Sequence, residues 1–356
     1  MLLPKKQIKN EKQFKYIKKK GKKFKPIKIS IIRSKIKAHN FNREYELSPL
    51  FFLIIKIFLI FLLLYILITF ITIIKSKKTF FCFCAIARNE NLYAREIVSY
   101  YLSIGAGKFI LGDNNLNNTE KLSDVLSDYI SNGTVEIIDL IGQNVFQAEF
   151  YGFVYEKYKN KCNWISFFDF DEYLIMHFEK GKNITVKEFL SNKIFSDCES
   201  IEINWVLVDD NNLVYYDQRP TIVRFTHPIY KTFSNIFVKS IVRGGLNKTT
   251  FTKSEHIPDK HLLICNSDGK KITRYDPYTI GSPVYKNAEL WHYTTRTAEE
   301  FLKKIKRGFL GTQKKYLKSL KDFFSRNKFT KEKLYIFEKG LNMTFPKFHE
   351  SKYKLD

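Results

Sequence analysis

A run of 25 nearly apolar residues, 50–74, divides the chain into two parts of different character. It reads LFFLIIKIFLIFLLLYILITFITII, which as a helix would be about 37 Å long. That length crosses a bilayer with some tilt, and Lys56 lies near the N-terminal end, where a lysine can reach the headgroups. A cleavable signal peptide has a shorter apolar run, and a buried core helix does not need apolar residues on every face. The run therefore predicts a single transmembrane helix.

The segment before the apolar run, residues 1–49, is predicted to be a basic cytoplasmic tail. Residues 1–47 hold 16 Lys or Arg against three Glu, within a net charge of +24 for the whole chain. A basic flank favours the cytoplasmic side and suits contact with anionic membrane lipid, and a long C-terminal domain is translocated largely regardless of its charge. Lys75, Lys77 and Lys78 leave the local charge on the two sides of the span about even, so the orientation stays open. No zinc-ligand spacing or nucleic-acid-binding motif accompanies this charge, and we expect no nucleic-acid partner.

The remainder of the chain carries two signs of the secretory pathway. Five N-x-S/T sequons follow the span, at Asn117, Asn132, Asn183, Asn247 and Asn342. They agree with a domain beyond the membrane, although a chain this rich in Asn would contain some by chance. All five cysteines also follow the span: Cys82, Cys84, Cys162, Cys198 and Cys265. An odd number leaves at least one unpaired, and the spacing does not give the connectivity. We expect a Golgi or other secretory-pathway membrane protein, if the source is eukaryotic.

From residue 79 apolar strands alternate with amphipathic helices. The strand-like runs are TFFCFCAIA (79–87), KFILG (108–112), TVEIIDLI (134–141) and WISFFDFD (164–171). Between the first two, apolar residues recur at i, i+3, i+4, i+7 and i+8, with Asn89 as a possible cap and Gly105 at the end. Residues 122–130 and 146–158 predict two further helices. The order β-α-β-α-β-α-β favours an α/β fold, a largely parallel sheet with helices on both faces, over a domain at 79–345 with a tail at 346–356.

Polar clusters follow three of these strands. They are Arg88-Asn89-Glu90, Asp113-Asn114-Asn115 and Asp169-Phe170-Asp171-Glu172. Because ligands bind beyond the carboxyl ends of strands in such sheets, we expect the clusters to form one site. After a less regular middle with the strand-like pieces SIEINWVLV, PTIVRFT and NIFVKSIV, a helix is predicted to open at Thr297 with Glu300 completing a capping box.

The sequence Asp169-Phe170-Asp171 is the feature that points to chemistry. On a strand its two carboxylates would share a face, and a divalent cation would relieve their repulsion. Mg²⁺ and Mn²⁺ prefer oxygen ligands and often combine one or two carboxylates with phosphate oxygens. A bare D-x-D is a weak signal, since acidic pairs also occur at strand ends that open into solvent.

Three longer segments carry a family resemblance. CAIARNENLYAREIVSYYLSIGAGKFILGDNN, WISFFDFDEYL and LWHYTTRTAEEFLKKIKRG resemble glycosyltransferase family 92 and its family-2-like relatives. The resemblance spans roughly residues 80–308 and is weakest over 180–285, where INWVLV resembles the tryptophan-containing strand of the family. It implies a GT-A fold with a Rossmann-like mixed sheet, and a metal-dependent, inverting transfer of a sugar, often galactose, from a nucleotide donor such as a UDP-sugar to a glycan or glycoconjugate.

The resemblance also assigns roles to residues. It implies that Asp169, Asp171 and His292 hold Mn²⁺ or Mg²⁺, with Asp169 also near the donor. Donor binding is implied for Arg88, Asn89, Glu90, Asp113, Asn114, Lys304 and Arg307. His292, beside two aromatic residues, could instead be a core residue, and Lys304 and Arg307 could lie on a solvated basic face. For the base that an inverting enzyme needs, Asp210 is a candidate, in a segment where the sequence departs from the family pattern.

Two other functions are compatible with parts of the sequence. A dehalogenase-type phosphatase also places two aspartates after a strand, but there the pair ends the first strand and Thr or Val follows the second Asp by two residues. Here the pair ends the fourth strand and Tyr173 stands at that position. A membrane-anchored binding or scaffolding protein that keeps the fold without catalysis is the second alternative, and the intact aspartate pair argues against it.

Overall fold

The computed structural model describes residues 48–74, 78–177, 184–247, 251, 254–259, 261–273, 275–308 and 313–345. The chain divides into two compact units, residues 1–72 and 73–356. Helix α1 (Pro49–Ile74) accounts for the described part of the first unit. Over Pro49–Leu67 its mean hydropathy is 3.1 and none of its residues is buried. The predicted helix is confirmed, and it is long and apolar enough to cross a membrane. The basic tail before residue 48 and the C-terminal tail after residue 345 lie outside the described residues.

The second unit is built around a mixed sheet in which ten described strands take part. They are β1 (Thr79–Ala87), β2 (Lys108–Asp113), β3 (Val135–Asp139), β4 (Cys162–Phe167), β5 (Glu172–Met176), β6 (Ser200–Val208), β7 (Pro228–Ile229), β8 (Val238–Arg243), β9 (Ile264–Asn266) and β10 (Ala288–His292). The main path runs β3-β2-β1-β4-β8-β6-β10-β5, and β7 and β9 pair with β6. Strands β1 to β4 are parallel, as predicted, whereas β8 is antiparallel to β4 and β6. Strand β10 is again parallel to β6.

Helices cover both faces of this sheet. The described helices of the second unit are α2 (Asn91–Ser103), α3 (Leu122–Val125), α4 (Ser127–Ser131), α5 (Gln147–Tyr158), α6 (Val186–Leu190), α7 (Thr221–Arg224), α8 (Ala298–Gly308), α9 (Gln313–Arg326) and α10 (Lys331–Leu341), with short 3₁₀ turns at Lys193–Phe195 and Phe233–Ile236. Alternate residues of β1 face opposite sides. Phe81 and Phe83 belong to a core with α2 and α6, whereas Cys82 and Cys84 belong to a core with α5. The expected α/β layering is confirmed.

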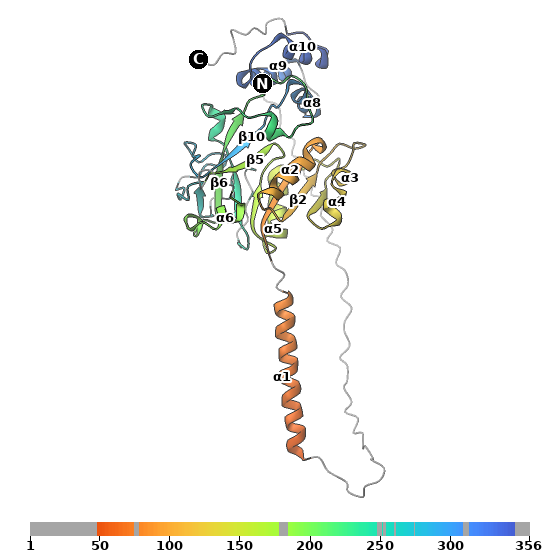
Figure 1. The fold of residues 1–356 in the computed structure, drawn as a ribbon, viewed down its shortest axis with the longest axis vertical. Helices are drawn as coiled ribbons and strands as arrows, with labels where there is room; N and C mark the ends of the chain where they lie inside the picture. The colour runs from red at the N-terminus through yellow and green to blue at the C-terminus, as the bar shows by residue number, and fades with distance from the viewer. Residues whose placement is uncertain are drawn as a thin grey trace, which may run out of the picture. The chain divides into compact units, whose positions relative to one another are not determined.

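The last three helices have a core of their own. Phe301 of α8, Phe323 of α9 and Phe337 of α10 are among its buried residues. Figure 1 shows these helices together at one end of the second unit. The predicted capping box opens α8, because the Glu300 N–H donates to Thr297 Oγ1 (3.2 Å) and the Thr297 N–H donates to Glu300 Oε2 (3.3 Å). This start fixes where the basic side chains of α8 lie.

Two disulfides join strands of the sheet or its margins. Cys82 of β1 pairs with Cys162 of β4, and Cys198 pairs with Cys265 of β9. Cys84 is the unpaired, buried cysteine. The odd count therefore leaves one thiol, as the sequence requires.

Three local predictions were wrong. PTIVRFT forms the short helix α7 rather than a strand. Pro220 stands before its first turn and Arg224 reaches across to Glu300, so a tertiary contact outweighs the β-branched composition. Asn89 does not cap α2, because its backbone is left-handed (φ 54°) and Glu90 occupies the N-cap position. Strand β4 ends at Phe167, so Asp169 and Asp171 lie in the turn before β5.

Candidate active site

The polar clusters that follow the strands meet at one edge of the sheet. Ala87 is in register with Asp113, and Cys84 with Phe167, so β1, β2 and β4 end close together. The parallel strand β10 ends at His292 on the same edge. Hydrogen bonds join the loops: the Asn89 N–H donates to Asn115 Oδ1 (2.5 Å), and Arg296 Nη2 donates to the Phe170 carbonyl (3.4 Å). The expected convergence of the three clusters is therefore present.

Asp169 is held on the side of α5 and β8. Its Oδ2 lies 3.0 Å from Lys239 Nζ, and its Oδ1 accepts hydrogen bonds from Gln147 and from the Tyr151 hydroxyl. The Asp169 side chain is 29% exposed and Lys239 only 1%. Burial lowers the pKa of Lys239, but Asp169 and Glu172 overcome it and the net shift is upward, so the lysine is charged. A buried ammonium thus neutralises this carboxylate.

Asp171 is held on the opposite side by β10 and α8. Its Oδ1 lies 3.4 Å from His292 Nε2, and its Oδ2 accepts a hydrogen bond from Lys304 Nζ (2.8 Å). Burial raises the pKa of Asp171, but Lys304 and His292 outweigh it, and the pKa lies well below its usual range. Burial lowers the pKa of His292 despite the attraction of Asp171. At neutral pH the pair is therefore a carboxylate beside a neutral imidazole.

These protonation states are the ones that a divalent cation requires of its ligands. Carboxylate and imidazole donors suit Mn²⁺, and Mg²⁺ or Mn²⁺ sites often hold one or two protein ligands together with phosphate oxygens. Asp171 and His292 fit such a two-ligand set. Asp169 is paired with Lys239 instead of lying against Asp171 and His292, and its role as a metal ligand stays a prediction. In agreement, no group of three His, Cys, Asp or Glu side chains that could hold a metal occurs among the residues described.

The residues expected around the nucleotide are placed in different ways. Arg88 is exposed, and Glu90 is buried with its Oε2 3.3 Å from Arg296 Nη1. Asp113 is buried, and its two oxygens accept backbone N–H groups of Asn115 (3.2 Å) and Leu122 (2.8 Å). Burial raises the pKa of this carboxyl.

Asp113 thus binds the segment that follows it, whereas Asn114 binds the loop after β3. The side-chain amide of Asn114 donates to the Leu140 and Gln143 carbonyls, both at 2.9 Å. In this arrangement Asp113 and Asn114 shape the edge of the sheet. A role in donor binding stays a prediction for both.

A pocket of about 210 Å³ adjoins this edge. It is lined by Asn89, Leu92, Tyr93, Thr294, Thr295, Arg296, Glu300, Lys303 and Lys304. Two predicted donor-binding residues, Asn89 and Lys304, are among them. Since Lys304 also binds Asp171, the pocket and the aspartate turn are parts of one site.

Asp210 is not placed as a base should be. It is buried, and its Oδ2 forms an ion pair with Lys333 Nζ at 2.5 Å, with side chains 2% and 0% exposed. Its Oδ1 accepts the Asn212 N–H (2.9 Å). This carboxylate is committed to a buried pair, so the structure speaks against the predicted catalytic role. Arg307 lies on α8, but its side chain is outside the described part of the chain.

Two residues of the site were not predicted from the sequence. Lys239 stands in the apolar strand VKSIVR, and a charged residue within a buried strand was the available signal. Arg296 lies between α8 and β10 with a left-handed backbone (φ 51°), and its guanidinium carbon lies 3.4 Å from the ring centroid of Tyr93. Nothing in the local pattern TTRT marks it.

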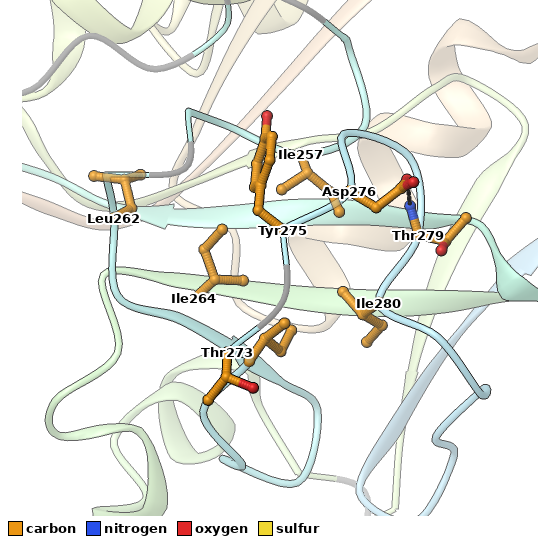
Figure 2. A pocket seen from close by; sticks show the side chains of 9 residues that line it. Ile257, Leu262, Ile264, Thr273, Tyr275, Asp276, Thr279 and Ile280 are labelled. Carbon is orange, nitrogen blue, oxygen red and sulfur yellow. Dashed lines mark hydrogen bonds between the residues drawn. The ribbon is translucent and has the colours of Figure 1, made fainter.

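A second pocket, of about 60 Å³, lies by β9 (Figure 2). Ile257, Leu262, Ile264 and Ile280 contribute much of its lining. The carboxylate of Asp276 accepts the backbone N–H groups of Tyr278 (2.9 Å) and Thr279 (3.0 Å). Because its acidic group is bound within its own turn and the pocket is small, it is a poor candidate for the active site.

Comparison with known proteins identifies the class of protein to which this edge belongs. Residues 77–309 match the model of Glycosyltransferase family 92. The match covers more than half of the chain and includes the aspartate turn, His292 and Lys304, so the protein is a glycosyltransferase. The chain belongs to glycosyltransferase family 92. No curated protein sequence shows a significant match.

Solved structures give only a remote likeness. The crystal structure of S. aureus TarS is 12% identical with a TM-score of 0.32, over 69% of this chain and 43% of that one. S. aureus TarS 1-349 has TM-scores of 0.30 alone and 0.31 in complex with UDP, at 12% identity over 74% of this chain and 71% of that one. The chain thus spans less than half the length of the first of these proteins. TM-scores this low support no conclusion about ligands.

Proposed function

We propose that this glycosyltransferase moves a sugar from a nucleotide-sugar donor to a glycan or glycoconjugate acceptor. A UDP-sugar is the expected donor and galactose the expected sugar, as the family resemblance implies. The observation that carries the proposal is the placement of Asp171 against both His292 and Lys304, beside the pocket of about 210 Å³. A carboxylate, an imidazole and an ammonium in this arrangement suit a cation together with a diphosphate.

Mn²⁺ or Mg²⁺ is the proposed cofactor, with Asp171 and His292 as its protein ligands. When bound, such a cation neutralises the charge that develops on a diphosphate leaving group. Lys304 adds a second positive charge on the other oxygen of Asp171, and its ammonium also reaches the Thr294 carbonyl (3.0 Å). The protein residues therefore orient the carboxylate from both sides. We expect the GT-A fold and inversion at the anomeric carbon.

The proposed location is a secretory-pathway membrane, with α1 as the span, a cytoplasmic N-terminus and the second unit beyond the membrane. The two disulfides support this side, because disulfides persist in oxidising compartments and are rare in the cytosol. The sequons after the span agree with it. The membrane partner would then be lipid in contact with α1 and the basic tail.

The test is UDP release by the full chain, purified in detergent and supplied with single UDP-sugars in Mn²⁺ or in EDTA. We expect one donor, UDP-galactose first, to release UDP in Mn²⁺ and much less in EDTA. The variant Asp171→Asn should lose at least about 100-fold, since even residues that only support metal ligands cost 10–100-fold. Folded protein that releases UDP from none of them would contradict a UDP-sugar donor and favour a binding protein without catalysis.

A further inference from the structure

Arg296 is a buried cation of the candidate site whose hydrogen bonding is incomplete. Its two described hydrogen bonds are long, 3.3 Å to Glu90 Oε2 and 3.4 Å to the Phe170 carbonyl. Its Nε–H is buried and has no hydrogen-bond partner among the described residues. A guanidinium has five N–H donors, and leaving a buried donor unpaired is unfavourable. The fold therefore holds an arginine with donors to spare.

A neighbouring arginine shows what a completed pair looks like. Arg224 donates to both oxygens of Glu300, at 2.7 and 2.9 Å, and that carboxylate also accepts the Tyr93 hydroxyl (2.7 Å). Arg224 and Glu300 thus form a closed, two-pronged ion pair with short bonds. Arg296 lies over the ring of Tyr93, whose hydroxyl belongs to this hydrogen-bonded group. The contrast marks Arg296 as the arginine with N–H donors left over.

Arg296 shares its pocket with two other hydrogen-bond donors. Thr295 Oγ1 is buried and also has no partner among the described residues. The ammonium of Lys304 has three N–H donors and uses two in described bonds. All three side chains line the pocket of about 210 Å³. Three donors, two of them cationic, around one hollow favour an anion as its occupant.

The backbone of Arg296 supports a functional role as well. Its φ of 51° is left-handed, a conformation that is unfavourable for a residue with a Cβ. Strained residues of this kind persist where the surroundings fix them, and they concentrate at ligand sites. Here the strain directs the guanidinium to the loop after β1 and to the aspartate turn at the same time.

We propose that Arg296, with Thr295 and Lys304, binds the diphosphate of the donor nucleotide in this pocket. The inference rests on the proposed function and adds the binding residue that the sequence did not reveal. A diphosphate supplies the acceptors that the guanidinium lacks, while Glu90 and Tyr93 hold the arginine in place. Uridine alone has no anionic group, so its affinity should not depend on Arg296.

The experiment compares Arg296→Gln with the wild-type full chain by calorimetry, using UDP and uridine in Mn²⁺. We expect the Kd for UDP to rise about 10- to 100-fold, as expected for the loss of a hydrogen-bonded charge, and the Kd for uridine to stay within about twofold. Arg219→Gln is the matched control, because Arg219 is an exposed arginine paired with Asp217. An unchanged UDP affinity, or an equal loss for UDP and uridine, would overturn the role.

Two further measurements keep the outcomes distinct. If Arg296→Gln does not fold, Thr295→Val and Arg296→Lys replace it, and each should weaken UDP more than uridine. If the wild type binds no UDP, the proposed function fails, and inorganic pyrophosphate becomes the probe. Pyrophosphate binding that Arg296→Gln abolishes would still support the anion site, and no pyrophosphate binding would overturn it.

Discussion

Two lysines neutralise the charges of the two aspartates in the turn after β4. Lys239 approaches Asp169 from β8, and Lys304 approaches Asp171 from α8. The two carboxylates are thus neutralised separately, and they do not need one shared cation between them. Only Asp171 lies beside His292, which is why the proposed cation site uses these two residues.

Asp210 is also paired with a lysine, but this pair is fully buried and bears on the stability of the fold. We predict that Asp210→Asn lowers the free energy of unfolding by about 3–5 kcal/mol, because it leaves the buried ammonium of Lys333 without its counter-charge. Urea denaturation measures this. Asp209→Asn is the control, since Asp209 is 30% exposed, and it should change stability by less than about 1 kcal/mol. A fully stable Asp210→Asn with lost activity would instead restore the catalytic role.

At the scale of elements, the pairing of β6 with β8 contains a buried acid. Glu202 of β6 accepts the hydroxyls of Ser200 (2.6 Å) and Ser240 (2.5 Å). Burial raises the pKa of Glu202 from 4.5 to about 8, against the lowering effect of the two serines. The folded protein therefore holds this proton up to about pH 8, whereas the unfolded chain loses it near pH 4.5.

This difference predicts a pH dependence with a definite sign. Below pH 4.5 both states are protonated, and between pH 4.5 and about 8 stability falls as the unfolded state alone ionises. Glu202→Gln removes that loss. At pH 8 its free energy of unfolding should therefore exceed that of the wild type by a few kcal/mol, on the order set by 1.36 kcal/mol per pKa unit. Urea denaturation at pH 5, 6, 7 and 8 tests it. Parallel stability curves for the two proteins would show that Glu202 is not the source.

The disulfides connect elements that are distant in sequence. The bond between β1 and β4 closes 80 residues, and the bond between Cys198 and β9 closes 67. We predict that reduction lowers stability by about 2–5 kcal/mol per bond, because each restricts the unfolded chain. Thiol titration in denaturant should find one reactive thiol before reduction and five after it. Five thiols in freshly purified protein would contradict the pairing.

Elements were easier to predict from the sequence than the site. The runs at 79–87 and 200–208 became strands with those bounds, because a continuous apolar stretch between turn residues has few alternatives. PTIVRFT became a helix because Arg224 is drawn to Glu300, a contact 76 residues away that no local pattern contains. Arg296 could not be predicted for the same reason, because its partners Glu90 and Phe170 come from two loops that are distant in sequence.

The aspartate turn shows which part of the site could be predicted from the sequence and which could not. Its position at the edge of the sheet followed from the strand before it, and Asp171 with His292 came together as the family resemblance implied. The separation of Asp169 depends on Lys239, which arrives from β8, 70 residues later along the chain. The spacing of residues in the sequence could not show that an antiparallel strand brings Lys239 to Asp169.

At the scale of the whole molecule, the proposed topology makes Asn132 a glycosylation site. Asn132 is exposed, its Oδ1 accepts the Thr134 N–H (2.9 Å), and the space beside Gly133 is open. In protein made by eukaryotic cells, Asn132→Gln should remove one glycan, seen as a smaller shift after glycosidase treatment. Thr134→Ser keeps the sequon and should keep the glycan. A chain with no N-glycan at any sequon would contradict the lumenal placement.

The measurement that tests the central claim most directly is calorimetric titration of the full chain, in detergent, with UDP. It is carried out in Mn²⁺, in EDTA, and in Mn²⁺ with Asp171→Asn. We predict that wild-type protein binds UDP in Mn²⁺, and that removal of the metal or of the Asp171 charge weakens binding at least about 10-fold. Equal UDP affinity in all three samples, or none in folded wild-type protein, would contradict a metal-assisted nucleotide-sugar site at Asp171 and His292.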